Sequence, residues 1–107
     1  MFNLNEYMKN NNSGGEYPLV KRIMCNDGFN FSAQASKFAY CSPRMNHEEG
    51  IVYNSVEVGF PSEKPDLIME YCETPSEPTE TVYGYVPVKI VEQLVELHGG
   101  FKCVHEL

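Results

Sequence analysis

The chain has 107 residues, 42% of them hydrophobic and 12% aromatic, and its formal net charge at pH 7 is −7. This length suits one domain, and this apolar content can form a core without disulfides or bound metal. No apolar run reaches the roughly 18 residues of a membrane span, and the first residues lack the pattern of a secretion signal. We therefore expect a single soluble cytoplasmic domain, residues 1–107, without membrane contact.

The charge is distributed unevenly along the chain. Residues 1–47 carry five basic and three acidic side chains, a net charge of +2, whereas residues 48–107 carry three basic and twelve acidic ones, a net charge of −9. Because no basic cluster is present, the sequence predicts no direct contact with nucleic acid. An acidic surface favours a basic protein partner or simply keeps the protein in solution. The sequence leaves open whether the chain forms a homodimer.

Residues 1–15 are predicted to be a flexible N-terminal segment. Residues 1–9 contain apolar side chains without a clear period, and residues 10–15 are asparagine, serine and glycine. Asparagine and glycine tolerate left-handed backbone and bury little apolar surface, so a run of them is typical of a loop.

Three strands are predicted over residues 17–25, 29–40 and 51–60. Asn26-Asp27-Gly28 separates the first two and is a strong hairpin signal. The first of these segments is rich in β-forming residues, and alternation of period two predicts that the second and third each have one buried and one wet face. The residues expected on the buried faces of the second and third strands are Phe29, Phe31, Ala33 and Ala35, and Val52, Val56, Val58 and Phe60.

Two helices are predicted over residues 63–73 and 88–98. Ser62 is the expected N-cap of the first helix, and Gly99 is placed to end the second. Residues 81–86 read as a short strand between them, and residues 101–104 as a last edge strand. The predicted fold is α+β, an antiparallel meander of about three to five strands packed by two helices.

The four cysteines do not form a recognisable metal or disulfide pattern. No Cys-x-x-Cys pair is present, and nothing else indicates export, so we expect four free thiols. Cys41 could act as a nucleophile with His47 or His98 as its base, but no motif supplies an orienting group or an oxyanion hole. The three histidines, including His105, lack ligand spacing. We therefore predict no catalytic residue, no enzyme activity, no metal and no cofactor.

Acidic residues recur along the first predicted helix at offsets of three and four. These offsets place them on one helix side, where like charges slightly destabilise the helix. Such a side is commonly a solvated face, and it is also suited to meeting a basic partner. The predicted partner-binding residues are Glu63, Asp66, Glu70 and Glu73 on the helix, followed by Glu77 and Glu80.

A second hypothesis is a small-molecule or nucleotide-binding module. Tyr83 and Tyr85 around Gly84 could stack on a base, with Lys37 and Arg44 as the charged groups. Alternation of core and surface positions along a strand also explains the two tyrosines. A third hypothesis is an enzyme that depends on Cys41.

Several stretches together resemble a family of small bacteriophage and prophage proteins of unassigned activity. These stretches are residues 32–37, 40–44, 55–62, 81–87 and 98–100, within a region spanning roughly residues 28–101. The resemblance brings no functional residues with it and implies a setting, the cytoplasm of a bacterial host. In that setting the acidic residues suggest a protein that binds and inhibits or redirects a basic, nucleic-acid-handling host protein, including one of the host's defences.

Overall fold

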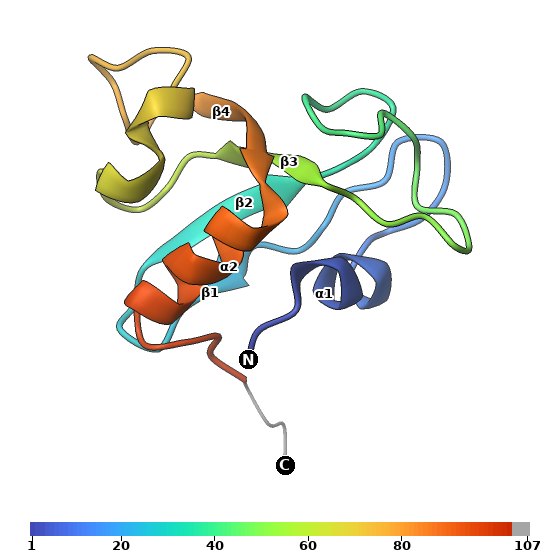
Figure 1. Cartoon of the computed structure of the whole chain (residues 1–107), viewed down its shortest axis with the longest axis horizontal. Coiled ribbons are helices and arrows are strands. Elements are labelled where there is room, and N and C mark those ends of the chain that lie inside the picture. Colours follow the sequence, from blue (N-terminus) through green and yellow to red (C-terminus); the bar gives the residue numbers. More distant parts are fainter. Residues whose placement is uncertain (104–107) are drawn as a thin grey trace.

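The structure is a computed structural model that describes residues 1–103 (Figure 1). It contains one antiparallel four-stranded sheet with strand order β1-β2-β3-β4, so each strand pairs with its neighbour in sequence. The predicted α+β meander is therefore confirmed. The elements are α1 (Leu4–Asn10), β1 (Ile23–Met24), β2 (Asn30–Gln34), β3 (Ser55–Gly59), the 3-10 helix η1 (Asp66–Tyr71), β4 (Val82–Pro87) and α2 (Val88–Leu97).

The predicted hairpin joins β1 and β2. Ile23 pairs with Phe31 and Met24 with Asn30, and Gly28 takes a left-handed φ of 97° in the turn. Phe29, Phe31, Ala33 and Ala35 are all buried, as the alternation predicts. Helix α2 lies against this sheet (Figure 1) and buries Val91, Leu94 and Val95 in the same core.

The first two strands are shorter than predicted. Before β1, the side-chain amide of Gln34 takes the place of a strand partner, because it accepts from the Val20 N–H at 2.8 Å and donates to the Val20 carbonyl at 2.9 Å. After β2, Ser36 starts a turn in which its hydroxyl accepts from the Phe38 N–H at 3.1 Å. Side chains thus satisfy backbone groups that a longer ladder would have paired.

The third strand begins at Ser55 rather than at residue 51. Val56 and Val58 are buried, but Val52 is 65% exposed and Phe60 is 50% exposed, so the predicted buried face is wrong at both ends. Val52 precedes the strand, and Phe60 follows it with a φ of 48°, which turns the chain out of the extended conformation.

The predicted α-helix over residues 63–73 is also wrong. A 3-10 helix covers only Asp66–Tyr71, and the residue before it is Pro65, with no side-chain cap. Ser62 does not cap this helix, because its hydroxyl accepts from the Asn30 N–H at 3.0 Å and so connects the loop to β2.

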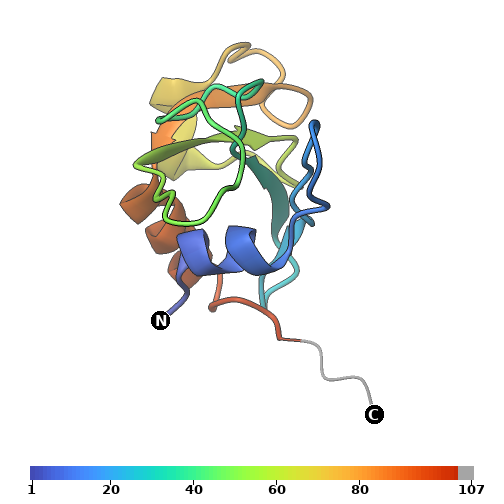
Figure 2. The ribbon, with the colours of Figure 1, turned by 90° about the vertical axis from the view of Figure 1, so that its right-hand side faces the viewer.

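Helix α1 was not predicted. Asn3 caps it by accepting from the Glu6 N–H at 3.0 Å, and Leu4 and Met8 are fully buried. The predicted flexible segment, residues 1–15, therefore includes seven residues of packed helix. Figure 2 shows α1 across the end of the sheet opposite the loops that connect β3 and β4.

The predicted last edge strand is reduced to a single bridge. Phe101 pairs with Cys25, and the Lys102 N–H donates to the Met24 carbonyl at 2.8 Å. Val104, the end of that prediction, lies outside the described residues. Among residues 1–103, no helix has the length and apolar character needed to cross a membrane.

Leu94 tests the packing of α2. Because this side chain is 1% exposed, Leu94→Ala should lower the free energy of unfolding by about 2–5 kcal/mol. Leu97 on the same helix is 69% exposed, so Leu97→Ala should change it by less than about 0.5 kcal/mol. Urea unfolding of both variants measures the difference. Equal effects would show that α2 does not bury the face described.

Candidate functional site

The six predicted partner-binding carboxylates all belong to one segment between β3 and β4. We call residues 63–80 the acidic segment. It runs through η1 and the loop that follows it, the yellow and light orange part of the ribbon in Figure 1. All six acidic side chains are exposed, and Lys64 is the one basic residue among residues 63–80. The segment therefore has a formal net charge of −5 and presents it to solvent.

The acidic residues do not lie on one side of one α-helix. Glu63 precedes η1 and Glu73 follows it. A 3-10 helix has three residues per turn, so Asp66 and Glu70, four residues apart, point in directions about a third of a turn apart. The expected single acidic helix face is wrong, and the carboxylates are instead spread over the surface of a compact segment.

Short contacts hold the acidic segment to the sheet. The Glu73 N–H donates to the Val82 carbonyl at 3.0 Å, and the Tyr83 hydroxyl donates to the Pro78 carbonyl at 2.6 Å. Within η1, the side chain of Ile68 is fully buried. Lys64 and Asp66 form a solvent-exposed ion pair at 3.6 Å, a contact that contributes little to stability. These anchors fix the backbone, and within residues 1–103 the carboxylates make no other ion pair apart from the 3.9 Å approach of Glu63 to His98.

The four residues of the second hypothesis do not form one site. Tyr83 is fully buried, so its ring cannot stack on a ligand. Burial also raises the pKa of its hydroxyl. Lys37 lies over the ring of Phe38, with its Nζ 5.3 Å from the ring centroid. Arg44 lies over the ring of Tyr40, with its guanidinium carbon 5.8 Å from the centroid.

Tyr85 is the fourth of these residues, and it lies beside Tyr40. The two ring centroids are 6.0 Å apart, and both side chains are close to half exposed. We call Tyr40 and Tyr85 the aromatic pair. Arg44 and Tyr85 thus both lie beside Tyr40, whereas Lys37 lies over Phe38 and Tyr83 is buried.

Cys41 lacks the properties of a nucleophile. The residue is buried, and its Sγ donates to the Ser36 carbonyl at 3.2 Å. Burial raises the pKa of the Cys41 thiol, whereas reactive cysteines have a lowered pKa and partial exposure. Of the two histidines considered as its base, His98 is engaged with Asp27, and burial lowers the pKa of His47.

His98 joins the end of α2 to the β1–β2 turn. Its Nδ1 lies 2.7 Å from Asp27 Oδ2, and its ring stacks on Phe29 with centroids 3.9 Å apart. The pKa of Asp27 is lowered, first by the N–H of Phe29, which donates to its carboxylate, and then by His98. His98 is therefore a structural contact between the end of α2 and the β1–β2 turn.

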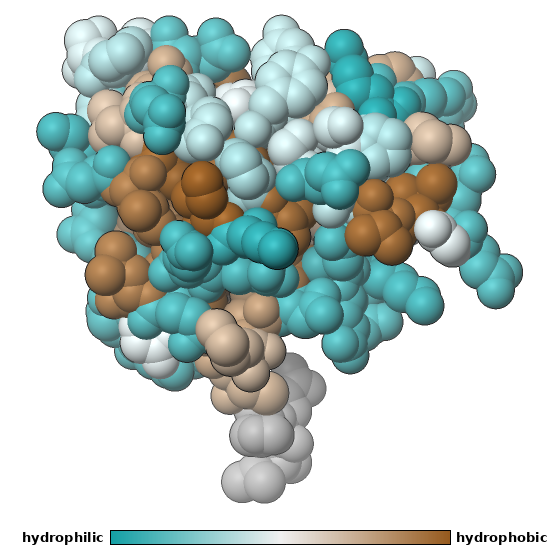
Figure 3. All heavy atoms as spheres, in the orientation of Figure 1, coloured by the Kyte–Doolittle hydropathy of each residue, from teal (hydrophilic) through white to brown (hydrophobic). Residues whose placement is uncertain are grey.

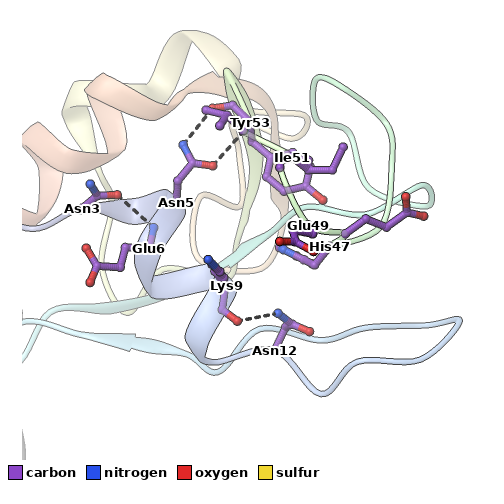
Figure 4. Close-up of a pocket in the computed structure, with 12 residues that line it drawn as sticks. Asn3, Asn5, Glu6, Lys9, Asn12, His47, Glu49, Ile51 and Tyr53 are labelled. Atoms are coloured by element: carbon purple, nitrogen blue, oxygen red, sulfur yellow. Dashed lines mark hydrogen bonds between the residues drawn. The ribbon is translucent and has the colours of Figure 1, made fainter.

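A cleft of about 770 Å³ lies between α1 and the chain before β3 (Figure 4). Asn5 closes one side of it by a pair of hydrogen bonds with the backbone of Tyr53, at 2.8 and 3.0 Å. His47 also lines it, and its buried Nε2 has no hydrogen-bond partner in the described part of the chain. The charged residues of the lining are Glu6, Lys9, Glu48 and Glu49.

The described part of the chain, residues 1–103, contains no group of three or more His, Cys, Asp or Glu side chains arranged to hold a metal ion. Comparison of this sequence and structure with family models, curated proteins and solved structures finds no match. The resemblance to small phage proteins therefore stays a hypothesis.

Sequence reasoning did not identify Tyr40 and Glu57 as neighbours of Tyr85. The available signal was Gly84, because a lone glycine within a strand pattern is typical of a β-bulge or a close approach. The pairing of Val56 with Val86 and of Val58 with Tyr83 shows such an irregularity at this position.

Thiol reactivity tests the placement of the cysteines. Cys103 is exposed and Cys72 partly exposed, whereas Cys25 and Cys41 are buried, and burial raises the pKa of Cys25 to about 11. With an aromatic disulfide reagent at pH 8, Cys103 should react first, Cys72 more slowly, and Cys25 and Cys41 only after unfolding. Protein denatured without reductant should titrate four thiols, and Cys103→Ser should remove the fastest phase. Rapid labelling of Cys41 in the native protein would contradict this order.

Proposed function

We propose that this protein binds a basic surface of another protein through the acidic segment and thereby inhibits or redirects it. The observation that carries the proposal is the set of six exposed carboxylates, with one lysine among them, on a segment anchored to the sheet. Carboxylates held in this way can occupy positions where a nucleic-acid-handling protein binds phosphates. In the setting that the phage resemblance implies, the partner is a host protein.

The electrostatics favour such a partner. A surface of one sign attracts a cleft of the other sign at long range and increases the rate of encounter. These exposed charges are screened over a Debye length of about 8 Å at physiological salt. The acidic segment therefore contributes mainly through association rate and through a strong dependence of affinity on salt.

Anchoring of the segment also favours binding over simple solvation. A flexible acidic tail loses conformational freedom when it binds, which reduces its affinity. Here the Glu73 N–H and the Tyr83 hydroxyl fix the backbone on both sides of the loop, so less freedom remains to be lost.

Neutralising the acidic segment tests the proposal. The four substitutions Glu63→Gln, Asp66→Asn, Glu70→Gln and Glu77→Gln remove four exposed charges and leave the buried residues unchanged. We expect this variant to lose the capture of a basic partner from bacterial lysate, measured by affinity capture and mass spectrometry at low and at physiological salt. It should keep the far-UV circular dichroism and the melting midpoint of the natural protein.

A matched control separates the location of charge from its amount. Glu6, Glu16, Glu48 and Glu49 are exposed and lie outside the acidic segment, so their replacement by Gln changes the net charge equally. The control should retain the partner with the same salt dependence. If both four-fold variants lose it to the same extent, the acidic segment is not the binding surface.

The cleft beside α1 favours a second candidate function, the binding of a small polar molecule. His47, Asn3 and Lys9 line this volume. Three carboxylates against one lysine in the lining disfavour a nucleotide and favour a neutral or cationic compound. A thermal shift across a panel of polyamines, sugars and nucleotides tests it, and no shift with any compound would remove this candidate.

A further inference from the structure

The surface beside the acidic segment contains a strained β-bulge. Glu57 of β3 faces two residues of β4, Gly84 and Tyr85, because Val56 pairs with Val86 and Val58 with Tyr83. Tyr85 has a φ of 53°, a left-handed conformation that bulky residues rarely adopt. Its side chain is 48% exposed, so burial of the ring does not account for the conformation. Bulges of this kind re-aim a side chain, and strained residues gather at functional surfaces.

Hydrogen bonds fix the backbone that carries both rings of the aromatic pair. The Tyr85 N–H donates to the Tyr40 carbonyl at 3.0 Å, and the Tyr40 N–H donates to Glu57 Oε1 at 3.1 Å. Tyr40 is 43% exposed. The backbone under two exposed aromatic rings is thus anchored, which reduces the backbone ordering that binding would require.

Carboxylates flank the aromatic pair. Glu57 is bonded to the Tyr40 backbone, and Glu73 approaches from the acidic segment. A Cβ at Gly84 would lie 3.5 Å from both Glu73 Oε1 and Tyr40 Cβ, so the glycine allows this carboxylate and this ring to approach the same point of β4. Exposed ring faces beside carboxylates form an environment that attracts cations.

A cation of the chain itself already lies over this site. The guanidinium of Arg44 is 5.8 Å from the centroid of the Tyr40 ring, and the residue is exposed. The aromatic pair, its carboxylates and the acidic segment form one continuous surface through Glu73, which both approaches Gly84 and bonds to Val82.

We propose that the aromatic pair anchors the partner by receiving one of its arginine side chains, which displaces Arg44 from Tyr40. This inference rests on the proposed function and identifies the group that is recognised. Arginine fits better than lysine, because its planar guanidinium can stack on a tyrosine while its N–H groups donate to a carboxylate. Arg44 acts as an internal competitor, so the site is open to a partner only when Arg44 moves away.

Binding of hexa-arginine and hexalysine peptides at physiological salt tests the site by fluorescence anisotropy. Tyr40→Leu and Tyr85→Asn each remove a ring, and asparagine tolerates the left-handed backbone at residue 85. Each substitution should weaken hexa-arginine binding by about two- to fivefold, as expected for an exposed cation–π contact. Tyr40→Phe and Tyr85→Phe keep the rings and should bind as the natural protein does, and all variants are compared by circular dichroism and melting.

Arg44 provides the sharpest comparison. Arg44→Gln should tighten hexa-arginine binding by about two- to fivefold because it removes the competitor. Lys37→Gln removes the same charge from a residue that lies over Phe38 instead, and should tighten binding less. Equal effects of the two substitutions would overturn the role of Arg44.

The outcomes separate this inference from the proposed function. If loss of either ring leaves hexa-arginine binding unchanged while neutralising the acidic segment weakens it, the anchor is wrong and the acidic segment still binds. If neutralising the acidic segment has no more effect than its matched control, the proposed function fails. Equal weakening of hexalysine and hexa-arginine by the ring substitutions would overturn the assignment to arginine.

Discussion

Helix α2 buries Val91, Leu94 and Val95 in the core and also holds two other parts of the chain in place. At its C-terminal end, His98 contacts Asp27, and the side chain of Asn26 donates to the Gly99 carbonyl at 2.7 Å. Along the helix, the half-buried Glu92 accepts from the Leu4 N–H at 2.9 Å and so binds the N-terminus of α1. A carboxylate at a helix N-terminus is favourable because it lies near the positive end of the helix dipole. Helix α2 thus orients α1 through Glu92 and the β1–β2 turn through its C-terminal end. On the face that carries α2, hydrophilic residues divide the apolar surface into separate patches (Figure 3).

Patterns that depend on neighbouring residues were predictable from the sequence. The hairpin at Asn26-Asp27-Gly28 and the alternation from Phe29 to Ala35 need only backbone preferences and one buried face. The apolar stripe of α2 and the left-handed Gly99 that ends it are equally local. Helix α1 carried a local signal too, since Asn3 and Glu6 have the spacing of a capping pair, but its short apolar stripe is recognisable only once Leu4 and Met8 have a core to enter.

Features that depend on distant contacts were not predictable. The acidic residues were spaced for an α-helix, yet only a 3-10 helix forms over Asp66–Tyr71, between Ser62, which is bonded to β2, and Glu73, which is bonded to β4. The lengths of β1 and β2 were overestimated because the side chains of Gln34, which bonds to Val20 before β1, and of Ser36, after β2, replace backbone pairing. The neighbours of Tyr85 depend on the bulge opposite Glu57, a register shift between strands that lie more than twenty residues apart.

The acidic segment and the aromatic pair differ in what they can recognise. Exposed carboxylates on the acidic segment act at a distance and with little geometric selectivity, so they attract any basic protein. Selectivity needs contacts that are short, directional and partly desolvated, and the inferred role of the aromatic pair is to provide them from a backbone that Glu57 and the Tyr85 N–H anchor. The bulge sets the face on which Tyr85 lies, because a regular β4 without the extra residue would send this side chain to the other face of the sheet. Under the proposed function, the acidic segment would attract many basic surfaces and the aromatic pair would retain few of them.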